Sequence, residues 1–529
     1  MIDFIFNYIY FFTYFHFFLI ILLFSINVNW IIKYLKFDKK TISILILIIL
    51  LAFALRININ TIRFGYGKNI QDSLTGYSLY NNQRWVRCEG GSLNKCLIYT
   101  APNHPIGHAF ILSNLYHIFG FPLNYEDSLF SMIISSSSIL LFFILCYLLF
   151  ENSAISLIAS FLMAIFHDHI LMAASKETSV YNLFFILASQ IFLILSLKIK
   201  TKKFSILTLF VIVWSFIFRP NSIITVLLIS IFYLYLNKKS LIFNLKKSKI
   251  FIKNPIFILI TISAALYFFV TIISLVHISK AHYSILENLS FKESISLQAE
   301  RFFYHLTYYF KFIKEQGYFI FPLFIFLFLK RKNKIKQKKY LLLWYILSVV
   351  SFSVYPGEKY SVSPHYMIVS FLPFFILSAG GIFYVFTDLL KKRSITTFFY
   401  GLLVCLLIYV LINNSLIALN LDPTNFYEKQ DEINEIIHDI PKIDLIINSH
   451  ADDMRFLILN GYSANDMARI HLVEKKIPDK ETIFIVNDEH YELNKEKDIE
   501  IIEKIMKTFN TTKIKDNNNY KTYRLTIRK

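Results

Sequence analysis

Side chains able to do acid–base or phosphate chemistry occur in separate polar segments of this 529-residue sequence. Asp72 and Glu177 lie in two of these segments, and Arg219 stands between two apolar runs. A carboxylate can accept a proton from a hydroxyl group, and an arginine can hold a phosphate through two parallel hydrogen bonds. A charge next to apolar runs is costly and is usually functional or paired, which makes Arg219 a candidate phosphate ligand.

Each of these residues also has a structural interpretation. Asp72 suits the start of a short interfacial helix, where a carboxylate caps free backbone N–H groups. Glu177 follows Lys176 and forms a solvated pair in the simplest interpretation. Arg219 at a helix end can extend its charge to the membrane surface.

Histidines supply the possible metal ligands. His167, Asp168 and His169 are consecutive at the end of an apolar run, and His104 precedes a proline. Imidazole is a common metal ligand, but His167 and His169 face the same side only in extended backbone. A divalent metal is therefore a hypothesis for His167 and His169, and no cofactor is certain. His104 is a candidate phosphate or metal contact, and its alternative role is structural.

Four cysteines fall into two kinds. Cys146 and Cys405 lie in apolar runs and are expected to be small core residues. Cys88 and Cys96 share the segment CEGGSLNKC, whose glycines allow a turn. In an oxidising compartment this pair predicts a disulfide, and two free thiols are the alternative.

Composition and charge order indicate a polytopic membrane protein. The chain is 55% hydrophobic and 17% charged, and its formal net charge is +19. Lysine and arginine gather in five short clusters between apolar runs, which is typical of cytoplasmic loops. We therefore interpret the positive charge as a signal of topology and do not expect nucleic-acid binding. The N-terminus lacks a basic region and a cleavage site, so the first apolar run is expected to be a retained helix.

The apolar runs predict about 12 transmembrane helices, with both termini outside the cytoplasm. We expect them at 8–32, 41–56, 128–150, 154–172, 179–197, 205–218, 222–236, 255–277, 317–329, 340–355, 366–387 and 395–416. Long segments at 57–127 and 278–316 and the tail 417–529 then lie outside. The tail predicts a small α/β domain, with buried strands at 444–448 and 482–486, an amphipathic helix at 497–507 and a last strand at 520–526.

Short motifs along residues 40–390 resemble those of the GT-C glycosyltransferases. The relevant members are the dolichyl-phosphate-mannose protein mannosyltransferases and the lipid A aminoarabinose transferases. Asp72 stands at the acid of the family's first outer loop, and His104-Pro105-Ile106 stands at its His-Pro-Pro segment. Phe218-Arg219-Pro220 resembles the family's Thr-Lys-Pro turn, and Pro364-His365-Tyr366 resembles its late Arg-Tyr pattern. The second proline, the glutamate after the acid and the late arginine are replaced here.

This resemblance implies a fold, a donor and roles for residues. The fold is an all-α polytopic membrane protein with a small extracytoplasmic α/β domain at its C-terminus. Residues 1–40 add an N-terminal transmembrane helix, 41–416 form the catalytic domain, and 417–529 form the soluble domain. The enzyme would be a multi-pass cell-membrane protein that moves a sugar from a polyprenyl-phosphate donor to an extracytoplasmic glycolipid, polysaccharide or protein.

The resemblance also assigns the site. Asp72 would be the general base, Glu177 the second acid, and Arg219 the group that holds the donor phosphate. Weaker candidates for substrate binding are His104, Tyr77, Lys359 and His365. A transporter or flippase of lipid-linked or small substrates is the main alternative, although the sequence shows no repeated halves. A polysaccharide polymerase or ligase and a non-catalytic assembly protein are further alternatives.

Overall fold

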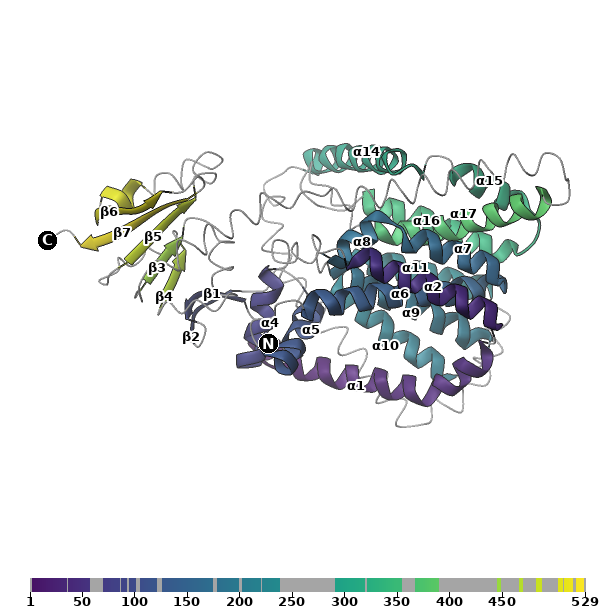
Figure 1. Cartoon of the computed structure of the whole chain (residues 1–529), viewed down its shortest axis with the longest axis horizontal. Coiled ribbons are helices and arrows are strands. Elements are labelled where there is room, and N and C mark those ends of the chain that lie inside the picture. Colours follow the sequence, from purple (N-terminus) through teal and green to yellow (C-terminus); the bar gives the residue numbers. More distant parts are fainter. Residues whose placement is uncertain are drawn as a thin grey trace. The chain divides into compact units, whose positions relative to one another are not determined.

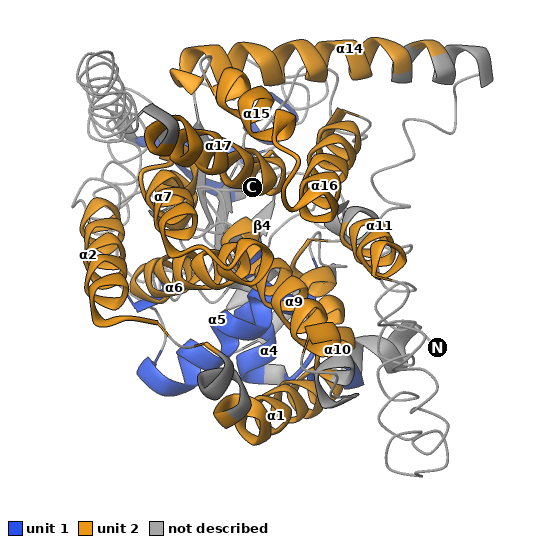
Figure 2. Ribbon diagram, turned by 90° about the vertical axis from the view of Figure 1, so that its right-hand side faces the viewer, with its two compact units in different colours: residues 1–10, 63–127, 422–529 blue, residues 11–62, 128–421 orange. Residues whose placement is uncertain are grey.

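The computed structural model divides the chain into two compact units, which are described separately (Figure 2). Unit 1 contains residues 1–10, 63–127 and 422–529, and unit 2 contains residues 11–62 and 128–421. The residues that the structure describes are 2–35, 37–57, 70–85, 87–92, 95–100, 105–120, 126–174, 178–198, 202–219, 221–237, 291–318, 321–353, 367–389, 445–448, 466–469, 482–487, 503–507, 509–516 and 520–527.

Unit 2 is helical wherever it is described, apart from short connections. Its helices are α1 (Ile2–Tyr34, from Phe11 onward), α2 (Lys39–Arg56), α6 (Glu126–Phe150, from Ser128 onward), α7 (Ser153–Ala164), α8 (His167–Ala174), α9 (Thr178–Lys198), α10 (Lys202–Phe218), α11 (Asn221–Leu236), α14 (Phe291–Glu315), α15 (Phe321–Lys330), α16 (Ile335–Ser353) and α17 (Ile368–Leu389). Ten of the expected spans therefore correspond to helices in the structure, whereas 255–277 and 395–416 lie outside the described residues.

Within the described part, four helices are long and apolar enough to cross a membrane. They lie at Tyr8–Asn29, Glu126–Phe150, Thr178–Lys198 and Ile368–Thr387. A fifth span results if the bent pair α7 and α8 crosses as one. These helices indicate a membrane protein, while the total of about 12 spans stays a prediction.

One predicted span is broken in the structure, and one predicted outer segment contains a long helix. The run at 154–172 was expected to be one helix, but α7 and α8 meet at an angle of 60°. The outer segment 278–316 contains the 25-residue helix α14. One face of α14 is buried, and its Tyr309 hydroxyl accepts a 3.0 Å hydrogen bond from Ser370 Oγ of α17. Because only one face of α14 is buried, its sequence mixes apolar and polar residues and lacks the continuous apolar run of a membrane span.

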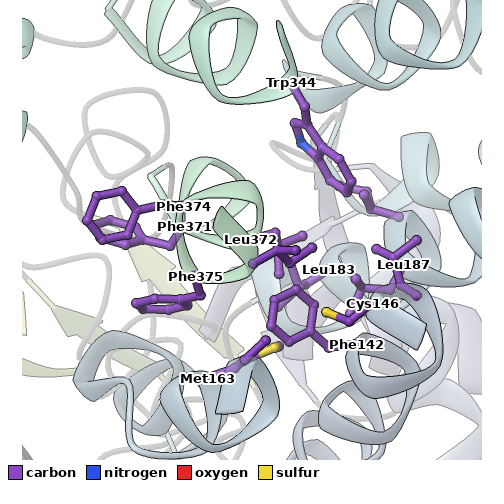
Figure 3. Packing of buried hydrophobic residues seen from close by; sticks show 14 of the residues in the cluster. Phe142, Cys146, Met163, Leu183, Leu187, Trp344, Phe371, Leu372, Phe374 and Phe375 are labelled. Atoms are coloured by element: carbon purple, nitrogen blue, oxygen red, sulfur yellow. The ribbon is translucent and has the colours of Figure 1, made fainter. Parts of the chain in front are cut away.

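Aromatic and aliphatic side chains fill the core of unit 2 (Figure 3). Phe142 and Cys146 from α6 lie with Leu183 and Leu187 from α9 in one buried cluster that α7, α16 and α17 complete. Cys146 is a free, buried thiol, which confirms its expected role as a small core residue. Cys405 lies outside the described residues.

One end of unit 2 collects the basic clusters. The carboxylate of Glu151, directly after α6, accepts from Lys198 at the end of α9 (2.7 Å) and from Lys334 before α16 (3.2 Å). Phe37, before α2, packs its ring 4.7 Å from that of Tyr147 near the end of α6. Three of the five predicted cytoplasmic clusters therefore lie at this end, which we call the basic end. The far end carries the opposite termini of the same helices.

Unit 1 combines two helices, a hairpin and a mixed sheet (Figure 1). Helices α4 (Ile70–Asn82) and α5 (Ile106–Phe119) pack together, and strands β1 (Arg87–Ser92) and β2 (Lys95–Thr100) form an antiparallel hairpin. The five-stranded sheet has the order β4-β3-β5-β7-β6. Its strands are β3 (Leu445–Asn448), β4 (Asp466–Arg469), β5 (Thr482–Asn487), β6 (Phe509–Asp516) and β7 (Tyr520–Ile527).

This sheet confirms the three strands expected in the tail. Strand β3 runs parallel to β4 and β5, and β7 runs antiparallel to β5 and β6. Residues 503–507 are helical, within the helix expected at 497–507. Strands β4 and β6 were not expected, because β4 is short and polar and β6 is rich in lysine, asparagine and threonine.

Candidate functional site

Asp72 is buried in unit 1 and contacts a histidine. It lies in the first turn of α4, and its Oδ2 is 3.0 Å from Nδ1 of His108 in α5. The side chains are 3% and 1% exposed. The two helices approach closely because Gly76 has no side chain: a Cβ there would lie 2.9 Å from Cβ of Leu112. An imidazole that donates from Nδ1 to a carboxylate carries its basic lone pair on Nε2.

His108 was missed by the sequence reasoning, which selected His104 from the same HPIGH segment. His104 lies outside the described residues, whereas His108 is on the buried face of α5. Tyr77, five residues after Asp72 on α4, is also buried, and desolvation raises its pKa. No local sequence signal identifies His108, because its contact with Asp72 joins residues 36 positions apart.

The hairpin separates the two cysteines of unit 1. Cys88 pairs with Tyr99 and Cys96 pairs with Gly91 in the strand register. Cys88 and Gly91 are three positions apart, or about 10 Å along a strand. A disulfide needs Cα atoms closer than about 7 Å, so a Cys88–Cys96 bond would require a different strand register. The disulfide stays a prediction.

A buried polar cluster lies toward the far end of unit 2, where α2 ends. The Arg56 guanidinium is fully buried and donates from Nε to Ser135 Oγ (2.7 Å) and from Nη2 to His169 Nδ1 (2.8 Å). Nη1 donates to the carbonyl oxygens of Ala52 (2.6 Å) and Ala164 (3.3 Å). Sequence reasoning noted Arg56 only as the end of a helix, although a cation in apolar surroundings is a functional signal.

His167 and Asp168 begin α8, next to this cluster. His167 Nδ1 lies 3.2 Å from Asp168 Oδ1, and both side chains are buried. Asp168 is the one buried carboxylate among the residues of unit 2 whose burial is described. The helical backbone does not meet the condition for a His167–His169 metal site, because side chains two residues apart diverge on a helix.

The environment of His169 gives the metal hypothesis no support. Metal binding through either ring nitrogen would require His169 to give up its contact with Arg56 or with Ser135 Oγ (3.1 Å). Across the described residues, no three or more His, Cys, Asp or Glu side chains form a group that could hold a metal ion.

Arg219 also belongs to the far end. Its backbone N–H donates to Ser215 O at the end of α10, a helix that starts four residues after Lys198 of the basic end. The adjacent Phe218 ring stacks on Tyr181 of α9 at 5.4 Å and 11°. Helix α9 begins at Thr178, and the preceding Glu177 lies outside the described residues. Lys359 and His365 lie outside them as well.

The far end of unit 2 thus gathers two arginines, two histidines and one buried carboxylate. The arginines can hold an anion or fix a backbone, and the carboxylate and imidazole can exchange a proton. These groups come from α2, α8 and α10, which are far apart in sequence. The arrangement places cationic and acidic groups at the end of the bundle away from the basic clusters.

Comparison with known proteins identifies relatives by structure only. No model of a known protein family matches the sequence, and no curated protein matches it. The oligosaccharyltransferase of Archaeoglobus fulgidus, solved with a tethered acceptor peptide containing an NVT sequon, is similar with a TM-score of 0.54 at 12% identity. The similarity covers 86% of this chain and 70% of that one.

Two further structures of the Archaeoglobus fulgidus enzyme give the same result. One holds an inhibitory peptide and dolichol-phosphate and has a TM-score of 0.53 at 12% identity, over 86% of this chain and 70% of that one. The other holds zinc and sulfate and has a TM-score of 0.52 at 13% identity, over 85% of this chain and 68% of that one. At such low identity the similarity establishes the fold.

Proposed function

Because the chain has the GT-C fold of membrane glycosyltransferases, we propose that it transfers a sugar from a polyprenyl-phosphate donor to an extracytoplasmic acceptor. The observation that carries this proposal is that Arg219 and the His167–His169 segment lie at the same end of a helical bundle with the GT-C fold. A lipid-linked donor keeps its chain in the bilayer and its phosphate at the interface. Cationic groups at a helix end suit such a phosphate.

Arg219 holds the donor phosphate in this proposal. It follows the last turn of α10 and is half-buried, so its guanidinium is partly desolvated without being removed from the surface. A partly desolvated arginine binds phosphate more strongly than one in water, because the local dielectric constant is lower. The dolichol-phosphate in the Archaeoglobus fulgidus complex supports a lipid phosphate as the donor class.

Asp72 takes the proton of the acceptor hydroxyl, with His108 as its partner. The 3.0 Å contact gives the pair two possible bases, the carboxylate itself and His108 Nε2. Either base acts only when the acceptor reaches this buried pair. The same contact also explains why α4 and α5 stay together, so a test must separate catalysis from folding.

Asp72→Asn separates these roles, because an asparagine oxygen still accepts from His108 but is not a base. Membranes containing the protein are incubated with sugar-labelled polyprenyl phosphates, and label is followed into lipid, polysaccharide and protein fractions. We expect Asp72→Asn to lower transfer by about 10²–10⁴-fold with normal expression and folding. Arg219→Ala should abolish the thermal stabilisation of the protein by dolichyl phosphate.

Asp72→Leu is the matched control for the structural role, since it removes both the base and the contact and should also lower the melting temperature. Full transfer by Asp72→Asn would exclude Asp72 from the chemistry. Uptake of a labelled substrate into liposomes without any glycosyl transfer would favour the transporter interpretation and overturn the proposal.

A further inference from the structure

Arg56 joins four separate backbone segments of unit 2. Its side chain leaves the last turn of α2 and reaches α6 through Ser135, α8 through His169, and the end of α7 through the Ala164 carbonyl. Arg56, Ser135 and His169 are each completely buried. The sequence separations from Arg56 are 79, 108 and 113 residues, so this cluster is a long-range tertiary tie.

The hydrogen bonds define which ring nitrogen of His169 carries the proton. Arginine only donates, so Nδ1 of His169 must accept from Arg56 Nη2. The neutral ring then carries its proton on Nε2 and donates it to Ser135 Oγ at 3.1 Å. The serine oxygen accepts from both Arg56 Nε and His169, which closes a ring of three side chains from α2, α6 and α8.

The same arginine contacts the point where the span breaks. Helix α7 ends at Ala164, α8 starts at His167, and the two are bent by 60°. Carbonyl groups in the last turn of a helix lose their usual N–H partners, and sharp kinks need a group that satisfies them. Arg56 Nη1 donates to the Ala164 carbonyl on one side of the break, and Arg56 Nη2 donates to His169 on the other.

We propose that Arg56 is a positioning residue that fixes the α7–α8 break and thereby holds His167 and Asp168 in place. Only a guanidinium has the planar fork needed to donate to α6, α7 and α8 together. A lysine ammonium would keep the charge but would not span these acceptors. The structural part of this inference stands alone, whereas its consequence for sugar transfer rests on the proposed function.

Amide hydrogen exchange of the protein in nanodiscs tests the structural part. Arg56→Lys and Arg56→Met should speed exchange at residues 165–172 by about tenfold or more, because a lost hydrogen bond to a charged group lowers the local opening energy. Gln190→Leu is the matched control. Gln190 is also fully buried and ties α9 to Ser230 of α11 and Tyr340 of α16, away from the break.

The control should lower the melting temperature without a selective increase of exchange at 165–172. In the transfer assay, Arg56→Lys should lower kcat per folded molecule while Gln190→Leu leaves it unchanged. Unchanged exchange at the break in both Arg56 variants, or a uniform increase throughout the bundle, would overturn the proposal. Because exchange needs no substrate, a chain without transferase activity would refute the proposed function and leave this test valid.

Discussion

Glu151 forms two ion pairs at the basic end of unit 2. It lies just beyond the membrane-spanning part of α6 and accepts from Lys198 and Lys334, which are 47 and 183 residues away. The hydrogen bond from Lys198 lowers the pKa of Glu151 more than desolvation raises it. The carboxylate side chain is 56% exposed, so solvent screens most of this interaction.

Glu151→Gln should lower the free energy of unfolding by about 0.5 kcal/mol at neutral pH and low salt. The pKa of Glu151 in the folded protein lies below its ordinary value of 4.5, so the stability difference between wild type and Glu151→Gln is complete above about that pH and disappears as the pH falls through the folded-state pKa. Thermal denaturation of the wild type and Glu151→Gln in detergent from pH 3 to 7 measures this stability difference. Glu315→Gln, which removes an exposed pair with Lys311 on α14, is the control. An equal loss of unfolding free energy at all pH values would show that the ionised Glu151 carboxylate does not stabilise the protein through its lysine partners.

For single residues, the sequence predicts which side chains are functional candidates better than it predicts which residues they contact. Asp72 and Arg219 are identifiable because a charge beside apolar runs is costly. The contacts that define their surroundings join residues far apart in the chain, such as Asp72 with His108 and Arg56 with His169. Local pattern contains no information about which of two nearby histidines faces a distant carboxylate, so His108 was not identified. His104, chosen as a phosphate or metal contact, lies outside the described residues.

At the element scale, hydrophobic runs predict helices well and breaks poorly. The expected 179–197 and 222–236 correspond to α9 and α11 within one residue at each end. The break between α7 and α8 directly precedes the polar residues His167-Asp168-His169 but contains no proline or glycine, so the usual local signals of a break are missing. Arg56 supplies the tertiary bond at that point, which explains why composition alone predicted one straight helix.

Helices α15 and α17 approach closely at a pair of glycines. A Cβ at Gly381 would contact the carbonyl oxygen of Phe324, lying 2.5 Å from its carbon and 2.8 Å from its Cα. These are backbone atoms, so a side-chain rotation cannot relieve the clash. Small residues at such positions let neighbouring membrane helices pack through van der Waals contact.

Gly381→Ala should therefore destabilise the protein by about 1–3 kcal/mol through overpacking. The melting temperature in detergent, together with the yield of monodisperse protein, measures this effect. Ser378→Ala, one turn earlier on α17, removes a hydroxyl bonded to Phe374 O without adding volume and should change stability much less. A melting temperature equal to that of the wild type would show that α15 and α17 are not packed as described.

At the scale of the whole molecule, charge sorts the ends of unit 2. Lys198, Lys334 and the start of α2 share the basic end, while Arg56 and Arg219 follow helices that run away from it. Basic loops are retained in the cytoplasm during membrane insertion. We therefore predict that the segments 57–127 and 417–529 lie on the opposite side of the membrane, where a polyprenyl-phosphate sugar is used in the proposed reaction.

Cysteine labelling tests this orientation in intact cells. In a variant without the four native cysteines, Gln83→Cys after α4 should react with a membrane-impermeant maleimide, because its side chain is exposed in the segment 57–127. Lys332→Cys, exposed between α15 and α16, should react only after the membrane is permeabilised. Both cysteines should react in detergent, and the cysteine-free parent should not react at all. The reverse pattern would place Asp72 in the cytoplasm, where it could not serve an extracytoplasmic acceptor, and would remove the basis for the glycosyltransferase mechanism.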